Sequence, residues 1–197
     1  MVLVIDTSSA RSGLALLASG EEGYEPAAEE VFPSSRGDGL ARRARRLAPD
    51  GSVDGVLVAL GPGSFTGVRV GVSYGVGLAM GLGVPLWGVG SLDLIAARSE
   101  GPVTALTEAG RGRVCFRVDG GEERLGEPTE LPRDRPAAGW LRETTAAAVR
   151  AAGIRLLEEP ELLSFAAGAA RAMGSACRLG YGRVALRYLS SVGRLEV

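Results

Sequence analysis

The sequence predicts an α/β fold in two tandem lobes, each with a mixed sheet flanked by helices. Three observations support this prediction. The first half of the chain has an antiparallel meander of apolar β-forming runs, which is followed by β-α units. A glycine-rich turn, Gly61–Gly67, leads into a long apolar segment with helical spacing. Gly101-Pro102 then interrupts the chain, and a second, less regular series of strands and helices follows.

The elements of the first lobe are predicted in chain order, each from a local signal. The strands are short runs of Val, Leu and Ile bounded by turn residues, and the helices begin after capping residues such as Ser64. We expect strands at Val2–Ile5, Leu14–Leu17, Glu29–Phe32, Val53–Leu60 and Pro85–Val89, and helices at Leu40–Leu47, after Ser64, and from Ser91 to about Ala97.

The second lobe is predicted less sharply, because its apolar runs are shorter and prolines interrupt residues 120–136. We expect strands at Val103–Leu106, Val114–Val118 and Trp140-Leu141, helices at Thr144–Ala152 and Leu162–Met173, and an extended arm at Val184–Val192. The domains are thus residues 1–100 and a smaller, degenerate lobe at 101–197. Tandem lobes in this order are typical of the actin-like, or ribonuclease H-like, architecture.

The helix after Ser64 carries a strip of small residues along one face. Its members recur every four residues: Gly67, Gly71, Gly75, Ala79 and Gly83. Each glycine costs nearly 1 kcal/mol relative to alanine in a helix, so their number indicates a close approach by another backbone. The helix is apolar nearly all round, which is typical of burial on several sides. The strip can pack on its own sheet or on a partner, and the pattern does not decide which row faces outward.

Composition excludes several classes of activity. The chain has 197 residues without a histidine or a lysine, so all 22 basic residues are arginines. Histidine metal sites, histidine general bases, a P-loop lysine and a Schiff base are therefore excluded. Two cysteines favour a reducing cytoplasm, and neither a signal peptide nor a membrane span is predicted. The net charge of −1 gives no global attraction for nucleic acid.

Three motifs resemble the TsaB (YeaZ) family, the bacterial partner subunit of the machinery that makes threonylcarbamoyladenosine in tRNA. They are L-V-I-D-T-S at 3–8, G-P-G-S-F-T-G-V-R at 61–69 and G-V-G-S-L at 88–92. The resemblance covers Met1–Arg98 and is weak beyond it. It implies the fold of the actin, sugar-kinase and Hsp70-like (ASKHA) superfamily.

The resemblance also implies a function without catalysis. Such a subunit docks the catalytic paralogue TsaD through helices of its N-terminal lobe, works with the ATPase TsaE and reaches tRNA through that complex. Free protein is expected to form a homodimer through the same apolar helices. With the glycine spacing, this favours a partner interface made of Gly67, Gly71, Val72, Gly75, Val76 and Ala79, with Leu40 and Leu47 on the preceding helix.

A cofactor site is weighed at the end of the first strand. Asp6, Thr7 and Ser8 match a turn that holds a magnesium-bound phosphate in actin-like ATPases, or they are a vestige of such a turn. Residues 140–145, where relatives carry a Gly-Asp-Gly phosphate turn, contain no glycine, so we expect no required cofactor. The second hypothesis is an enzyme, an actin-like ATP-binding kinase or ATPase that uses Asp6. No catalytic residue is assigned, and a protease is discounted because a conventional base is lacking.

Overall fold

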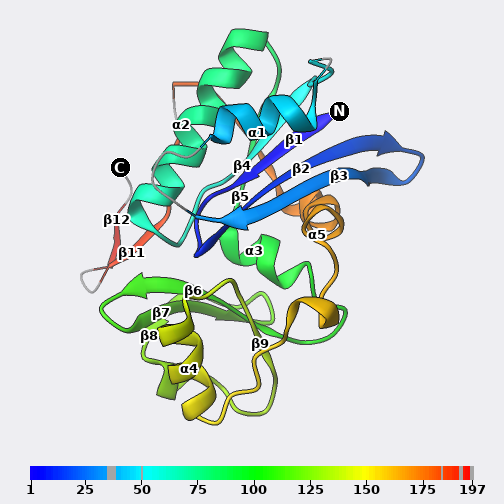
Figure 1. Ribbon diagram of the computed structural model, residues 1–197. Coiled ribbons are helices and arrows are strands. Elements are labelled where there is room, and N and C mark those ends of the chain that lie inside the picture. The colour runs from blue at the N-terminus through cyan, green and yellow to red at the C-terminus, as the bar shows by residue number, and fades with distance from the viewer. Residues whose placement is uncertain (35–38, 50, 183, 191–192, 196–197) are drawn as a thin grey trace.

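The computed structural model describes residues 1–34, 39–49, 51–182, 184–190 and 193–195. These residues form two larger sheets, one above the other in Figure 1 and each flanked by helices, and a third sheet of two strands. We call the six-stranded sheet with its helices the N-terminal lobe and the four-stranded sheet with its helix the C-terminal lobe. The predicted α/β class with two mixed sheets is confirmed.

The six-stranded sheet has the order β10-β5-β4-β1-β2-β3. Its strands are β1 (Val2–Asp6), β2 (Arg11–Gly20), β3 (Gly23–Pro33), β4 (Gly55–Ala59), β5 (Leu86–Val89) and β10 (Cys177–Leu179). The central trio β1, β4 and β5 is parallel, whereas β2, β3 and β10 are antiparallel to their neighbours. Every residue of β1 and β4 is buried, as expected of strands that helices cover on both faces.

Helices cover the two faces of this sheet. They are α1 (Leu40–Leu47), α2 (Phe65–Leu82), α3 (Ser91–Ala96) and α5 (Phe165–Ala172). Because side chains alternate along a strand, Leu3 and Ile5 of β1 face the α1–α2 side, and Val2 and Val4 face the α3–α5 side. The result is a three-layered lobe with a core on each side of the sheet.

The four-stranded sheet has the order β8-β7-β6-β9. Its strands are β6 (Thr104–Gly110), β7 (Arg113–Val118), β8 (Arg124–Gly126) and β9 (Ala137–Ala138), and α4 (Glu143–Ala151) packs beside it. Three short 3-10 turns, η1 (Pro128–Glu130), η2 (Glu159–Glu161) and η3 (Met173–Ser175), link the later elements. A separate two-stranded sheet joins β11 (Tyr188–Ser190) to β12 (Gly193–Leu195).

The late part of the chain differs from the prediction in its packing. The sequence assigns the residues after Ser164 to the second lobe, yet α5 packs against β2, β3 and α3, and β10 extends the first sheet beside β5. The predicted helix Leu162–Met173 begins only at Phe165, because Ser164 caps it by accepting a hydrogen bond from the amide of Ala167. The chain thus returns to the N-terminal lobe after building the second sheet.

Three smaller predictions are also corrected. Trp140-Leu141 is not a strand, since the short parallel strand is β9, three residues earlier in the chain. Gly83 is not part of the small-residue strip: it ends α2 in the left-handed conformation, with φ 66°. The helix predicted to be capped by Ser91 is preceded by Gly90 as its cap.

By length and composition, α2 is the one helix among the described residues that is apolar enough to cross a membrane. One side of this helix packs inside the protein. Val68, Gly71, Val72, Gly75 and Ala79 are buried in the N-terminal lobe. Packing within the lobe therefore accounts for the inner side of α2, and 28% of the helix is buried.

Candidate functional site

The small-residue strip of α2 faces the chain's own sheet. A Cβ at Gly71 would lie 2.3 Å from Thr7 Oγ1, and one at Gly75 would lie 2.3 Å from Val58 Cγ1. A Cβ at Gly67 would lie only 2.0 Å from the backbone oxygen of Thr7. The glycines therefore permit the close approach of α2 to β1 and β4, which is the first of the two possibilities that the sequence left open.

The predicted interface residues on this strip are corrected accordingly. Gly71, Val72, Gly75 and Ala79 are buried inside the lobe, so a partner cannot reach them in this conformation. Gly67 and Val76 are half-buried at the border of the strip. Periodicity identified a face that needs close contact, but it could not tell that the sheet itself supplies the contact.

The opposite side of α2 is exposed and mostly uncharged. Four of the five large apolar side chains that are exposed among the described residues belong to this helix: Phe65, Val70, Met80 and Leu82. Small residues lie between them, and a Cβ at Gly77 or Gly81 would meet nothing within 4 Å. We define the outer face of α2 as Thr66, Arg69, Val70, Ser73, Gly77, Met80 and Gly81, all exposed. Val70 and Met80 are thus uncovered apolar side chains on the outward side of this helix.

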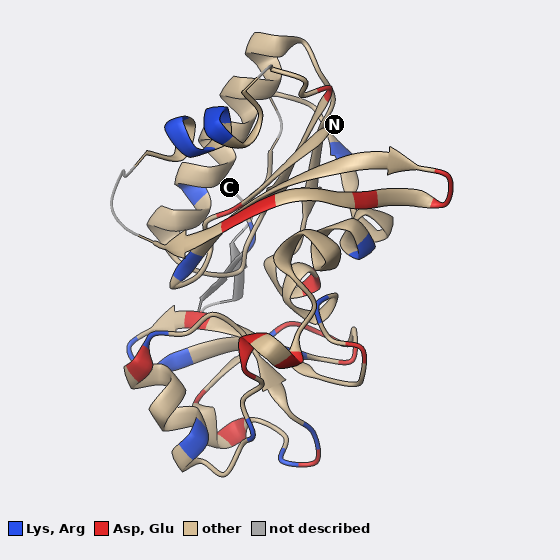
Figure 2. Cartoon of the chain, turned by 45° about the vertical axis from the view of Figure 1, so that its right-hand side comes forward, with Lys and Arg blue, Asp and Glu red and all other residues tan. Residues whose placement is uncertain are grey.

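Helix α1 borders this face and is basic (Figure 2). Burial raises the pKa of the Tyr74 phenol on α2, and the positive charge of Arg45 on α1 offsets part of that rise. The side chains of Tyr74 and Arg45 therefore lie close together. Arg42 and Arg45 are exposed, whereas Arg43 and Arg46 both pair with Glu30 of β3. Although burial acts in the other direction, hydrogen bonds from these two arginines lower the pKa of Glu30.

The predicted interface residues Leu40 and Leu47 on α1 are half-buried and pack against the core on the α2 side of the sheet. They anchor α1 to the lobe, and Arg42 and Arg45 form its exposed side. We call this surface, the outer face of α2 with Arg42 and Arg45, the α1–α2 face. The sequence signal for it is the row of exposed residues that lies opposite the glycine strip on the same helix.

The turn after β1 ties this strand to the start of α2. Thr7 Oγ1 donates a hydrogen bond to the carbonyl oxygen of Gly67 at 2.7 Å, and the Ser64 amide donates to the Ser8 carbonyl at 2.7 Å. The Ser8 amide donates to Asp6 Oδ1 at 2.8 Å. Ser64 in turn caps α2, as predicted, by accepting from the Gly67 amide. The Asp-Thr-Ser turn therefore has a structural role in fixing the angle at which α2 leaves the sheet.

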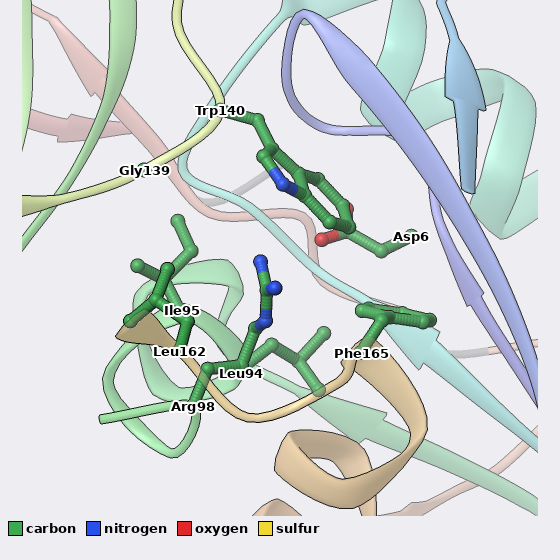
Figure 3. A pocket seen from close by; sticks show the side chains of 8 residues that line it. All are labelled: Asp6, Leu94, Ile95, Arg98, Gly139, Trp140, Leu162 and Phe165. Carbon is green, nitrogen blue, oxygen red and sulfur yellow. The ribbon is translucent and has the colours of Figure 1, made fainter. Parts of the chain in front are cut away.

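The space beside Asp6 is nearly closed. Figure 3 shows the residues that surround it, with Trp140 of the C-terminal lobe standing over Arg98 and Phe165 of the N-terminal lobe. The cavity measures about 10 Å³, which is room for a single water molecule. The ring centroids of Trp140 and Phe165 are 5.5 Å apart. A phosphate group does not fit in this cavity.

The Asp-Thr-Ser turn offers one carboxyl as a metal ligand, that of Asp6. Among the described residues, no group of three His, Cys, Asp or Glu side chains lies together in a way that could hold a metal ion. Asp6 is 1% exposed and stands as a lone carboxyl at the turn. Burial raises its pKa, and hydrogen bonds from Ser8 offset only part of this rise. A carboxyl whose neutral form is favoured is a poor ligand for a divalent cation.

Asp6→Asn should make the protein more stable at pH 7. Because the pKa of Asp6 is raised in the folded state, wild-type stability should fall as the pH rises from about 3.9, the usual unfolded value, through the folded pKa. The amide variant keeps an acceptor for the Ser8 amide and lacks this loss. Urea denaturation of both proteins between pH 4 and 7 measures the difference. An equal or lower stability of the variant at pH 7 would show that the charged carboxylate is needed.

An ion-pair cluster holds the two lobes together beside this cavity. Arg98 donates to Glu159 Oε2 at 2.7 Å, and the indole nitrogen of Trp140 donates to Glu159 Oε1 at 2.7 Å. Arg98 also donates to the Leu163 carbonyl at 2.9 Å. Burial opposes ionisation of Glu159, but hydrogen bonds from Arg98 and Trp140 lower its pKa below the usual value. The cluster joins the end of α3 to the C-terminal lobe through η2.

Glu159→Gln should lower stability at pH 7 by about 1 kcal/mol, the scale of a partly exposed pair, because Glu159 is 45% exposed. The folded pKa is depressed, so the contribution of Glu159 is present above about pH 4.3 and is lost as the pH falls through the folded pKa. The difference between the two proteins should therefore vanish in acid. Thermal denaturation of both proteins at pH 3 and pH 7 measures this difference. A difference in stability that persists at pH 3 would show that the ionised form of Glu159 is not its source.

The second expected phosphate turn is occupied by the chain's own carboxylate. Glu108 of β6 accepts hydrogen bonds from the Arg142 amide at 3.0 Å and from Thr145 Oγ1 at 2.6 Å on Oε1, and from Arg142 Nε at 2.6 Å on Oε2. Glu108 thus caps the N-terminus of α4, the end at which a helix attracts anions. The backbone amide of Arg142 at this end of α4 is therefore bonded to an internal carboxylate.

Sequence comparisons connect this geometry to known proteins. A family model described as "TsaD: tRNA N6-adenosine threonylcarbamoyltransferase" matches residues 46–132. The tRNA threonylcarbamoyladenosine biosynthesis protein TsaB of Bacillus subtilis is 35% identical over 89 residues, which is 44% of this chain and 39% of that protein. TsaB of Escherichia coli is 35% identical over 100 residues, which is 50% of this chain and 39% of that protein.

The resemblance to the TsaB (YeaZ) family is thereby confirmed. An uncharacterized protein of Mycobacterium leprae is also similar, with 32% identity over 150 residues, 66% of this chain and 40% of that protein. The matches span about two fifths of the length of these curated relatives. Two solved structures share the fold. YeaZ from Pseudomonas aeruginosa has a TM-score of 0.70 and 22% sequence identity, and the match covers 95% of this chain and 99% of that one. An uncharacterized protein from the same organism, described as similar to YeaZ, has a TM-score of 0.72 and 23% identity, and the match covers 96% of this chain and 99% of that one.

The site residues that the TsaB resemblance predicts fall into two groups in the structure. The Asp-Thr-Ser turn and the strip Gly67, Gly71 and Gly75 meet each other at the contact between β1 and α2. The α1–α2 face lies on the other side of the same helix. Sequence reasoning did not find Glu108, Arg98 or Glu159, because each acquires its role from a partner that is distant in the chain.

Proposed function

We propose that this chain is a non-catalytic partner subunit in tRNA threonylcarbamoyladenosine synthesis. It docks the threonylcarbamoyltransferase TsaD through the α1–α2 face, works with the ATPase TsaE and reaches tRNA through that complex. The single observation that carries the proposal is the uncovered face of α2, on which Val70 and Met80 are 42% and 57% exposed between small residues. Its relatives TsaB of Bacillus subtilis and Escherichia coli bear the name of this pathway.

The chemistry of the face specifies the partner's surface. The outer face of α2, with open space at Gly77 and Gly81, accepts a helix that carries its own apolar row, because small residues let two helix backbones approach. Arg42 and Arg45 at its rim call for carboxylates on the partner, which would speed association and fix the orientation. In the absence of the enzyme, a second copy of the chain covers the same face, so the free protein forms a homodimer.

The proposed role requires no cofactor of its own and places the protein in the cytoplasm, where its tRNA substrate is modified. The small size of the cavity at Asp6 and the carboxylate cap of Glu108 support this part of the proposal. The complex would act by assembly: docking stabilises the arrangement of TsaD in which the threonylcarbamoyl group passes from threonylcarbamoyl-AMP to adenosine. This chain contributes binding energy and no reacting group.

Reconstitution tests the proposed function. TsaD, TsaE, tRNA, ATP and threonylcarbamoyl-AMP are incubated with and without this chain, and modified adenosine is quantified by mass spectrometry of the digested tRNA. We expect formation of modified adenosine over many turnovers only when the chain is present. Equal modification in its absence would overturn the proposed role.

The alternative function, an actin-like kinase or ATPase using Asp6, makes a different prediction. It requires magnesium-dependent ATP binding by the chain alone and the loss of that binding in Asp6→Asn. Calorimetric titration of ATP with magnesium into the wild-type protein decides between the two hypotheses. The proposed role predicts that Asp6→Asn leaves any heat of ATP binding unchanged, and tight binding that Asp6→Asn abolishes would favour the enzyme.

A further inference from the structure

The hairpin that joins β6 to β7 forms one wall of a hollow on the C-terminal lobe. The hollow measures about 280 Å³ and lies between this hairpin and the first turn of α4. Three arginines line it: Arg111 and Arg113 from the hairpin and Arg142 from the segment before α4. It is separate from the cavity beside Asp6, and none of the roles described above uses Arg111 or Arg113.

The charges in the hollow are unbalanced. Among the residues that the structure describes, neither Arg111 nor Arg113 forms a hydrogen bond or an ion pair through its side chain. Arg142 pairs with Glu108 only through Nε, which leaves its two terminal nitrogens without a partner among the described residues. Glu108 is the one carboxylate of the lining, and both of its oxygens already accept hydrogen bonds. The lining therefore contains three arginines against one carboxylate that is already engaged.

The hairpin holds its arginines on a short, tightly bent turn. Gly110, Arg111 and Gly112 have φ values of 75°, 54° and 75°, so three successive residues are left-handed. A residue other than glycine is uncommon in this conformation. Because strands on both sides are paired through residues 108–114, Arg111 and Arg113 start from fixed backbone positions. Such preorganisation reduces the entropy cost when a ligand orders the two side chains.

From this arrangement we infer that the hollow binds a phosphate group. The planar guanidinium forks match phosphate oxygens in pairs, and three of them around one space suit a tetrahedral oxyanion that bears negative charge. Thr144 adds a hydroxyl donor to the lining. No aromatic side chain belongs to the lining, so the site recognises the phosphate and not a base. The phosphate comes from an RNA backbone or from a free phosphate or nucleotide, and the RNA source rests on the proposed function.

The test compares three variants with the wild-type chain. R111A/R113A removes both unpaired side chains, R111K/R113K keeps the charge without the planar fork, and R133A/R178A removes two arginines from elsewhere as a control with the same change of charge. Binding of fluorescently labelled tRNA to the complex with TsaD is measured by anisotropy at several salt concentrations. Inorganic phosphate is titrated into each free chain while the arginine Nε–H resonances are followed by NMR.

For the RNA source, R111A/R113A should weaken tRNA binding about 10-fold and reduce the salt slope by about 1 for each phosphate that is no longer neutralised. R111K/R113K should restore part of the affinity, and R133A/R178A should leave it unchanged. If the ligand is instead a free phosphate or nucleotide, millimolar inorganic phosphate should shift the Arg111 and Arg113 resonances of the wild-type chain. The arginine variants should then bind tRNA as tightly as the wild-type chain does. Neither effect, or equal effects in the R133A/R178A control, would overturn the inference.

The failure of this inference can be told apart from failure of the proposed function. Co-elution of each variant with TsaD on a sizing column is recorded for the same samples. If the wild-type chain and TsaD do not co-elute, the proposed function fails, and the phosphate titration still tests the hollow. If they co-elute and the arginine variants behave as wild type in both assays, the phosphate site is wrong and the docking proposal stands.

Discussion

Met80→Glu should weaken pairing with TsaD about 100-fold while leaving the fold of the chain intact. Met80 is 57% exposed on the outer face of α2, so a carboxylate there is solvated in the free protein. In the complex it would be buried without a partner, and an unpaired buried charge costs several kcal/mol. The dissociation constant is measured by isothermal titration calorimetry, and the unfolding free energy by urea denaturation.

The matched control for this prediction is Ala147→Glu. It places the same charge on an exposed position of α4 in the other lobe. Its affinity for TsaD should equal that of the wild-type chain. Self-association of the free protein should be abolished in Met80→Glu and retained in Ala147→Glu, since the proposed function assigns both interfaces to the same face. Equal affinities of the two variants would exclude the outer face of α2 from the interface.

Gly67→Ala should destabilise the N-terminal lobe by about 3 kcal/mol, the upper part of the range for overpacking a dense contact. A Cβ at residue 67 would lie 2.0 Å from the Thr7 backbone oxygen. Because this is a backbone atom at the end of a fully buried strand, it has no rotamer by which to move away. The Thr7 hydroxyl bond to the Gly67 carbonyl would be strained as well. Urea denaturation followed by circular dichroism gives the free energy of unfolding.

Gly77→Ala on the same helix should have the opposite effect. A Cβ at residue 77 meets nothing within 4 Å, so only the helix propensity changes, and alanine is favoured by up to about 1 kcal/mol. The pair of variants thus separates the inward from the outward side of α2 by the sign of the stability change. Destabilisation of similar size in both would mean that α2 packs with a different face inward.

The elements that the sequence predicted well have strong local signals. The bounds of α1 agree with the prediction, and Ser64 caps α2 as its position before a helical pattern indicated. The buried strands β1 and β4 coincide closely with the expected runs of Val, Leu and Ile. Capping and hydrophobic periodicity are read within one turn or one strand, so a single sequence contains them completely.

The orientation of α2 could not be predicted from the sequence. A stripe of small residues indicates that another element packs closely against the helix, but it does not identify that element. Both the lobe's own sheet and a partner helix would meet the requirement, and the structure places Gly71 and Gly75 on the sheet. The return of α5 and β10 to the first sheet was missed for a similar reason. Cys177–Leu179 is a short run, and only its pairing with β5 makes it a strand.

The roles of Glu108 and Glu159 depend on tertiary contacts in the same way. Arg142 stands at the N-cap of α4 without an acceptor side chain of its own, and Glu108 from β6 supplies the missing acceptor. An arginine at an N-cap cannot accept a hydrogen bond from the helix amides. Its presence there is the one sign in the sequence that a residue from another element supplies the acceptor. For Glu159, no local pattern indicates that Arg98 and Trp140 both donate to it.

We propose the α1–α2 face as the surface on which the partner enzyme docks. Hydrogen–deuterium exchange of this chain, alone and in complex with TsaD, tests it most directly. We predict that peptides covering Leu40–Leu47 and Phe65–Leu82 gain protection on complex formation, while α4 and the β6–β7 hairpin do not. A stable complex in which α1 and α2 exchange as in the free chain would contradict the account.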